Sequence, residues 1–143
     1  MAILDKISNI FSVDEIESPA TLEEIEMLQK FSKIDIPLDF IELMSLGTEI
    51  EIKVKNEMYV RFWRPSGCID MNEAYEVQKY FPKSLAIGDD EGGGALIYML
   101  GKDGFGIYYS RFSDLDIEEA VKITSSLTEF LVENEGVDIL LNL

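Results

Sequence analysis

The spacing of apolar residues changes at Gly47, and this change limits the folds that the chain can adopt. Before Gly47, apolar residues recur every three or four positions over 22–31, which is the spacing of a helix with one buried face. After Gly47, they alternate with charged residues over 50–54 and again over 58–62, which is the spacing of half-buried strands. The two kinds of spacing in one short chain predict helices packed on a sheet.

Local signals mark where the helices begin and end. Thr21 followed by Glu24 is a capping box, which satisfies free backbone N–H groups at the start of the 22–31 helix. A short, largely buried helix is expected between Pro37 and Gly47, because proline suits the first helical position and glycine suits a helix end. An amphipathic pattern within residues 1–18 predicts a short leading helix.

Two further helices are expected later in the chain. Asp70 and Glu73 resemble a helix start, and the helix should run until Pro82 stops it. Ser126 followed by Glu129 is a second capping box, and it predicts a final helix.

The strands are expected to follow one another through short turns. Lys55 and Asn56 lie between the first two strands, which therefore form a hairpin. Further strands are expected at 85–87, 95–100 and 105–109, with a tight turn at 101–104 between the last two. The expected fold class is α+β: a single domain over residues 1–143, with a mainly antiparallel sheet of about five or six strands and helices packed against it.

Charge limits the partners of the chain. Its 143 residues hold 12 Lys and Arg against 28 Asp and Glu, a net charge of −16, while 47% of the residues are hydrophobic. Such a chain has enough apolar residues to fold and carries its charge outside. The charge repels nucleic acid and anionic membranes, so we expect no direct binding to either, and it attracts cationic proteins. The alternative is that the acidity only keeps the protein soluble.

The residues available for catalysis are few. The chain has no His, which removes the commonest general base and zinc ligand, and one cysteine, Cys68, which is interpreted as a small buried hydrophobe. We therefore expect no enzyme, no catalytic residues, no metal and no cofactor. A carboxylate-pair hydrolase stays open as a third reading, because acids are abundant. The single cysteine and the absence of a signal-peptide pattern predict a cytoplasmic protein.

One segment stands out as a candidate site. Asp89, Asp90 and Glu91 lie beside three glycines in the segment Gly88–Gly94, and such a cluster could ligate a hard cation. The acids do not alternate as they do in calcium loops. The favoured interpretation is an exposed loop between strands, in which the glycines permit positive φ or close backbone approach.

Acidic residues also gather in two runs. Residues 14–26 hold six acids and no base, and residues 114–138 hold eight acids and one base. These runs are either solvated helix faces or parts of one acidic surface that docks a basic protein. A rival interface is Trp63 with the basic first hairpin, although a lone Trp at a strand end more often packs in the interior. The candidate protein-binding residues are Asp89, Asp90, Glu91, Trp63, Glu118 and Glu119.

The order of several short motifs resembles the SUKH superfamily, the proteins related to fungal regulators of cell-wall assembly and glucan synthesis. The matching motifs are Ile36-Pro37-Leu38-Asp39-Phe40 through Leu46-Gly47, Trp63, the helix ending at Phe81-Pro82, Leu85-Ala86-Ile87-Gly88-Asp89 with its glycines, Gly106-Ile107-Tyr108 and Ser126–Leu131. The resemblance covers about residues 20–133. The chain departs from the family pattern where Gly47-Thr48 replaces the usual pair of glycines.

This resemblance implies helices packed on an antiparallel sheet, and it adds no catalytic residues. Bacterial proteins of this kind look like immunity proteins, so the resemblance implies a protein that binds and neutralises a cognate polymorphic toxin, often a nuclease. The acidity of the chain suits a basic toxin of this type. The alternative is a regulatory or scaffolding module in cell-wall or glucan metabolism.

Overall fold

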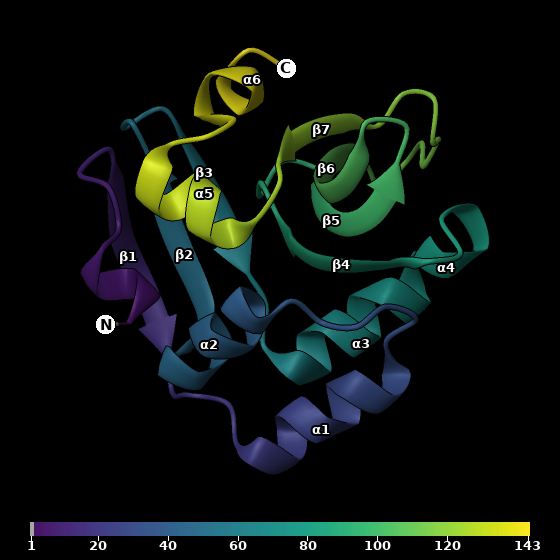
Figure 1. Cartoon of the computed structure of the whole chain (residues 1–143), viewed down its shortest axis with the longest axis horizontal. Helices are drawn as coiled ribbons and strands as arrows, with labels where there is room; N and C mark the ends of the chain where they lie inside the picture. Colours follow the sequence, from purple (N-terminus) through teal and green to yellow (C-terminus); the bar gives the residue numbers. More distant parts are fainter. Residues whose placement is uncertain (1) are drawn as a thin grey trace.

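Seven strands form one antiparallel sheet in the computed structural model, which describes residues 2–143 (Figure 1). In sheet order, which is also chain order, the strands are β1 (Phe11–Glu17), β2 (Thr48–Val54), β3 (Met58–Phe62), β4 (Ser84–Asp89), β5 (Gly94–Gly101), β6 (Gly104–Arg111) and β7 (Val121–Thr124). The helices are the 3-10 turn η1 (Ile3–Asp5), α1 (Leu22–Phe31), α2 (Leu38–Leu46), α3 (Pro65–Ala74), α4 (Val77–Tyr80), α5 (Leu127–Glu133) and α6 (Val137–Leu141). The predicted α+β class is confirmed, with more strands than expected.

The predicted helix caps and the hairpin turn can be compared with the hydrogen bonds and backbone angles of the structure. In the capping box of α1, the Thr21 hydroxyl accepts the Glu24 N–H at 3.1 Å, and the Glu24 carboxylate accepts the Thr21 N–H at 2.9 Å. The hairpin of β2 and β3 turns at Lys55 and Asn56, which have φ of 51° and 59°. The second predicted capping box is only half formed: the Ser126 hydroxyl accepts the Glu129 N–H at 3.1 Å at the start of α5, but the Ser126 N–H donates to the Thr124 hydroxyl and not to the Glu129 carboxylate.

Helices cover the sheet from two sides (Figure 1). α3 contacts β4, and α1 contacts α3 from outside. α5 contacts β7 and α2, and its Leu127 and Phe130 pack against apolar residues of β3, β5 and β6. The core therefore lies between α5 and the curved sheet and between the sheet and α3.

A side chain binds the backbone groups of β4 that have no neighbouring strand. β3 and β4 pair only at Arg61–Asp89 and Phe62–Gly88, so the start of β4 lacks a strand on that side. Asn72 of α3 takes the place of the missing strand: its amide donates to the Ala86 carbonyl at 2.9 Å and accepts the Ala86 N–H at 3.0 Å. Asn72 is fully buried, and this bond pair satisfies backbone groups that burial would otherwise leave unpaired.

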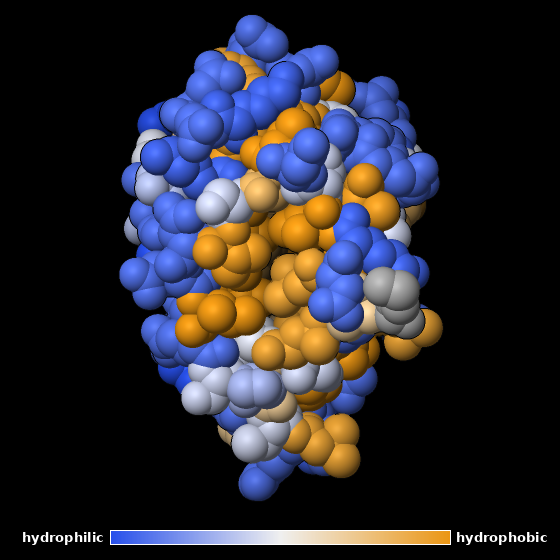
Figure 2. All heavy atoms as spheres, turned by 90° about the vertical axis from the view of Figure 1, so that its left-hand side faces the viewer, coloured by the Kyte–Doolittle hydropathy of each residue, from blue (hydrophilic) through white to orange (hydrophobic). Residues whose placement is uncertain are grey.

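The predicted leading helix is wrong. Only η1 is helical there, and residues 11–17 form β1, which pairs with β2 through a register that shifts twice. Phe11 and Val13 alternate as in a strand, and pairing with β2 satisfies the backbone of this segment. Val13 and Ile16 are 38% and 46% exposed. Figure 2 views the molecule from the side that carries β1 and shows apolar side chains gathered around a hollow there.

The predicted helix over 70–81 is correct only in part. α3 begins five residues earlier, with Pro65 in its first turn, and ends at Ala74. Glu76 adopts the left-handed conformation with φ of 51°, and α4 follows as a separate turn. Tyr75 packs against Phe112 with ring centroids 4.3 Å apart, so a tertiary contact lies at the break. β7 and α6 are also absent from the elements that the sequence predicts.

No helix within residues 2–143 has both the length and the apolar character that crossing a bilayer requires.

Candidate functional site

The loop between β4 and β5 uses its first two acids as internal hydrogen-bond acceptors. Asp89 accepts the Glu91 N–H at 2.9 Å and the Trp63 Nε1–H at 2.9 Å. Asp90 accepts the N–H groups of Gly92 and Gly94, both at 2.8 Å, through one oxygen. Its other oxygen accepts the Tyr109 hydroxyl at 3.1 Å. The two carboxylates therefore hold the loop in one conformation.

Glycine is required where the loop meets β6. A Cβ on Gly94 would collide with the ring of Tyr109, and Gly93 has φ of 94°, a conformation that favours glycine. The Gly93 carbonyl accepts the Phe112 N–H at 3.0 Å. The prediction that these glycines serve positive φ and close backbone approach is confirmed.

Trp63 supports the loop from inside the molecule. It is 4% exposed, its indole N–H binds Asp89, and its ring stacks on Phe112 with centroids 6.2 Å apart. This burial favours the packed interpretation of Trp63 over an exposed anchor for a partner.

Glu91 lies close to another acid and to an arginine. Arg61 lies between Glu51 and Glu91, with nitrogen–oxygen distances of 2.9 Å and 3.7 Å. Burial, followed by the hydrogen bond and the charge of Glu51, raises the pKa of Glu91 to about 7, against the lowering effect of Arg61. Glu91 therefore exchanges a proton near neutral pH.

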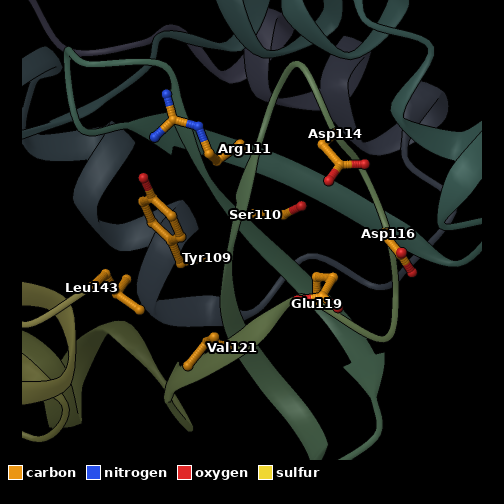
Figure 3. Close-up of a pocket in the computed structure, with 8 residues that line it drawn as sticks. All are labelled: Tyr109, Ser110, Arg111, Asp114, Asp116, Glu119, Val121 and Leu143. Atoms are coloured by element: carbon orange, nitrogen blue, oxygen red, sulfur yellow. The ribbon is translucent and has the colours of Figure 1, made fainter.

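A hollow of about 480 Å³ opens beside this loop (Figure 3). We call it the acidic hollow, and its lining residues are Tyr109, Ser110, Arg111, Asp114, Asp116, Glu119, Val121 and Leu143. The end of β6, the loop over 112–120 and the start of β7 supply seven of them.

Backbone contacts shape the loop that carries the three acids of the hollow. The Asp114 N–H donates to the Arg111 carbonyl at 3.0 Å. Asp116 accepts the Glu118 N–H on its carboxylate at 2.9 Å and the Glu119 N–H on its carbonyl at 3.1 Å. Glu118 itself does not line the hollow, and its carbonyl accepts the Lys102 ammonium at 2.8 Å. Of this predicted pair, only Glu119 faces the site.

Two side chains connect the loop to neighbouring acids. Arg61 joins Glu51 of β2 to Glu91 of the loop, and Tyr109 joins Asp90 of the loop to the hollow. We call this connected group the acidic band, and its acids are Glu51, Asp90, Glu91, Asp114, Asp116 and Glu119. The band thus combines acids from three separate parts of the sequence.

The basic residues of the first hairpin are largely paired. Arg61 binds Glu51 and Glu91, Arg64 binds Glu17 at 3.2 Å, and Lys55 binds Asp138 at 3.5 Å. Lys53 lies over the ring of Tyr59 at 5.5 Å. These contacts weaken the rival interface, because its cations already have partners within the chain.

Sequence reasoning missed Tyr109 and Arg111 as lining residues. The neighbouring tyrosines Tyr98 and Tyr108 are fully buried. Tyr109 is half-buried and borders the hollow. The adjacent Arg111 and the acids from 114 onward were the available signal, since they follow directly at the end of a predicted strand.

The chemistry available at the site is that of three acids, a phenol and one guanidinium, that of Arg111. Within residues 2–143, no group of three or more acid, His or Cys side chains is arranged to hold a metal ion. Burial and the charge of Asp90 raise the pKa of Tyr109, so the phenol stays protonated. Cys68 is fully buried, and burial raises the pKa of its thiol, which makes it an inert core residue as predicted. The arrangement is suited to binding cationic groups.

Comparison with protein families places most of the chain in one of them. The family model SMI1 / KNR4 family (SUKH-1) matches residues 19–133, which include the loop and the acids of the hollow. No curated protein matches the chain. The family includes immunity proteins and SMI1/KNR4 regulators and is generally non-catalytic. The match covers most of the chain and agrees with the resemblance seen in the sequence, so the chain belongs to the SMI1 / KNR4 family (SUKH-1).

Proposed function

We propose that this protein is a cytoplasmic immunity protein that neutralises a cognate toxin by stoichiometric binding, and that the toxin is a basic, nuclease-type protein. The observation that carries the proposal is the acidic band. Its acids come from β2, the β4–β5 loop and the segment between β6 and β7, and two bridging contacts, at Arg61 and Tyr109, connect them. Family membership supports a role in protein binding.

The physical argument concerns charge and rigidity. A nuclease binds the phosphate backbone through cationic side chains, and a protein of net charge −16 attracts the same surface. Complementary charge speeds the encounter and disfavours wrong partners. Asp89 and Asp90 are held by the Trp63 and Tyr109 contacts, so the loop loses little conformational freedom on binding.

The direct test uses the product of the gene immediately upstream. We expect this product to form an equimolar complex with the purified protein, seen by size exclusion with light scattering, and to lose its nuclease activity at a one-to-one ratio. The variant Glu23→Gln/Glu26→Gln, on the exposed face of α1, should protect as well as the wild type. An upstream product that is neither bound nor inhibited contradicts the proposal.

A regulatory or scaffolding role in cell-wall or glucan metabolism is the second candidate, and the SMI1/KNR4 part of the family favours it. Deleting the gene alone separates the two roles. An immunity protein should become dispensable when the toxin gene is deleted with it, whereas a regulator should leave a changed cell wall in both strains.

We propose no catalytic role. Purified protein supplied with divalent metal should not turn over glycoside, phosphoester or peptide substrates. Turnover that survives repurification and disappears in Asp89→Asn or Asp90→Asn would establish the carboxylate-dependent hydrolase instead.

A further inference from the structure

The sheet ends on one side in a strand whose outer edge is uncovered. β1 is the first strand of the sheet and, within residues 2–143, pairs only with β2 (Figure 1). Residues 12–17 are all exposed, and their N–H and C=O groups make no backbone hydrogen bond outside that pairing within the described part of the chain. An edge of unpaired backbone groups is able to bind a further strand.

The chain itself shields the opposite edge of the sheet. β7 is only four residues long and contacts α5 and α6. Gly136, at the start of α6, lies so close to the Ile123 carbonyl of β7 that a Cβ at this position would collide with it. The two ends of the sheet therefore differ, because β7 is covered by the C-terminal segment and β1 is left open.

The pairing of β1 with β2 shows which backbone groups point outward. The Lys55 N–H donates to the Ile10 carbonyl at 2.8 Å, so the backbone of Lys53, two residues earlier, also faces β1. Ser12 lies opposite Lys53 and bonds to it. Since backbone groups alternate along a strand, the N–H and C=O of Val13 point away from β2. These two groups are available to an added strand.

Apolar side chains are exposed along the same edge. Val13 lies opposite Ile52, which is fully buried, yet Val13 is 38% exposed and Ile16 is 46% exposed. Figure 2 shows this face, with apolar side chains around a hollow. The apolar side of the sheet thus continues to its last strand without cover. An apolar side chain of an added strand would pack beside Val13, as neighbouring strands pack across a sheet.

The charges of β1 determine which strand would fit. Asp14 and Glu15 are exposed and have no ion pair within residues 2–143, and β1 contains no basic residue. A second copy of the chain, paired at this edge, would bring two rows of acids together, and like charges across a strand pair are destabilising. A strand with basic side chains would place opposite charges there.

We propose that β1 binds, by strand addition, an extended segment of a protein partner in which apolar and basic residues alternate. The segment pairs with the backbone of Val13, its apolar side chains pack beside Val13 and Ile16, and its basic side chains face Asp14 and Glu15. This inference goes beyond the proposed function, because none of the acids of the acidic band lies on β1.

The test is an NMR titration of isotope-labelled protein with synthetic peptides. The first probe, acetyl-Arg-Val-Arg-Ile-Arg-Val-amide, alternates as the proposed segment does. It should produce saturable shifts at the amides of residues 12–17 and slow the hydrogen exchange of the Val13 amide, because that N–H gains an acceptor.

Three control peptides separate strand addition from attraction by charge. Acetyl-Arg-Arg-Arg-Val-Ile-Val-amide has the same charge without the alternation, and acetyl-Glu-Val-Glu-Ile-Glu-Val-amide has the alternation with the opposite charge. The third is the first probe with every backbone nitrogen methylated, which removes its N–H donors. None of the three should slow exchange at Val13.

Protein variants test the backbone and the acids separately. Val13→Pro removes the outward N–H without removing a bond to β2, and it should abolish the shifts at residues 15–17. Asp14→Asn/Glu15→Gln should weaken binding about threefold or more, because it removes two opposite-charge pairs across the strands. Glu23→Gln/Glu26→Gln removes the same charge from α1 and should bind as the wild type does. Thermal melts show that each variant is folded.

Three results would overturn the inference. The first is equal binding of the alternating peptide and the reordered peptide of the same charge. The second is equal affinity of Asp14→Asn/Glu15→Gln and the wild type for the alternating peptide. The third is a dimer of the purified protein that Val13→Pro dissociates, because a second copy would then occupy the edge. The proposed function fails differently, since a toxin that is not bound removes that function and leaves this titration unchanged.

Discussion

Two acidic segments that look equivalent in the sequence have different roles in the structure. In the 14–26 segment, Glu24 caps α1, Glu17 pairs with Arg64, and Asp14 accepts the Tyr59 hydroxyl at 3.1 Å. In the 114–119 segment, Asp114, Asp116 and Glu119 line a hollow and have no ion pair within residues 2–143. Figure 1 shows α1 and the β6–β7 connection at opposite ends of the molecule.

The difference shows that the number of acids in a segment does not decide what they bind. In the first segment, three of the six acids make a helix cap, an ion pair or a hydrogen bond within the chain. The second is held by backbone contacts and by the buried Leu115, so its carboxylates face solvent with their charge uncompensated. Strong acidity in a sequence therefore marks candidates, and the partners of each carboxylate decide among them.

The largest expected effect comes from removing the support of the loop. Trp63→Ala should lower the free energy of unfolding by about 3–5 kcal/mol, because it opens a cavity in the core and releases Asp89. Leu22→Ala in the 14–26 segment should change it by less than about 0.5 kcal/mol, since Leu22 is 74% exposed. Urea denaturation measures both. Similar costs for the two variants would show that Trp63 does not support the loop.

Single substitutions at Asp90 and Glu26 test whether an acid that holds the β4–β5 loop contributes more to stability than an exposed acid of the 14–26 segment. Asp90→Ala should cost about 2 kcal/mol, because the carboxylate accepts two loop N–H groups and the Tyr109 hydroxyl. Glu26→Ala removes an exposed acid and should cost less than about 0.5 kcal/mol. Thermal melts give the stabilities, and hydrogen exchange at Gly94 should accelerate only in Asp90→Ala. Unchanged exchange at Gly94 is the contrary result.

The one strong structural role predicted for the 14–26 segment is its capping box. Thr21→Ala should cost about 1 kcal/mol, because the Glu24 N–H loses its acceptor at the start of α1. Thr21→Ser keeps the hydroxyl and should retain most of the stability. If alanine and serine are equally stable in chemical denaturation, the capping box contributes nothing measurable.

The smallest expected effect is a pH dependence at Glu91. The pKa of Glu91 is raised from 4.5 to about 7 in the folded protein, so the folded state holds this proton more tightly than the unfolded state. The stabilisation is full below pH 4.5 and is lost as pH rises to about 7. Over this range, the free energy of unfolding should fall more steeply in the wild type than in Glu91→Gln. Glu23→Gln should follow the wild type, and identical slopes for Glu91→Gln and the wild type contradict the raised pKa.

Local signals predicted much of the fold. The capping box at Thr21, the Ser126 cap of α5, the alternating strands and the turn at 101–104 depend on neighbours in the chain, and each is in its predicted place. The misassigned segments depend on distant partners. Residues 11–17 become a strand because β2 lies beside them, and α3 ends beside the packing of Tyr75 on Phe112. The role of Asn72 could not be predicted from its neighbours, because its side chain binds the backbone of Ala86, 14 residues later in the sequence.

The candidate site was predicted in composition but not in geometry. Asp89, Asp90 and Glu91 were recognised as a special loop, and the acids after residue 114 were recognised as a run. The contact that joins them is the Tyr109 hydroxyl on Asp90, which requires β6 to lie beside β5 in the register found here. The hollow does not follow from local spacing, because its lining comes from β6, the segment between β6 and β7, and the end of the chain.

The central claim is that the acids around the hollow, and not acidity in general, draw in the cationic partner. The most direct measurement is the association rate constant with the upstream gene product for wild type, Asp116→Asn/Glu119→Gln and Glu23→Gln/Glu26→Gln, at low and high salt. We predict that the variant of the hollow associates about tenfold more slowly at low salt, that this difference shrinks at high salt, and that the α1 variant matches the wild type. Equal association rates for the two variants, or rates that do not respond to salt, would contradict the account.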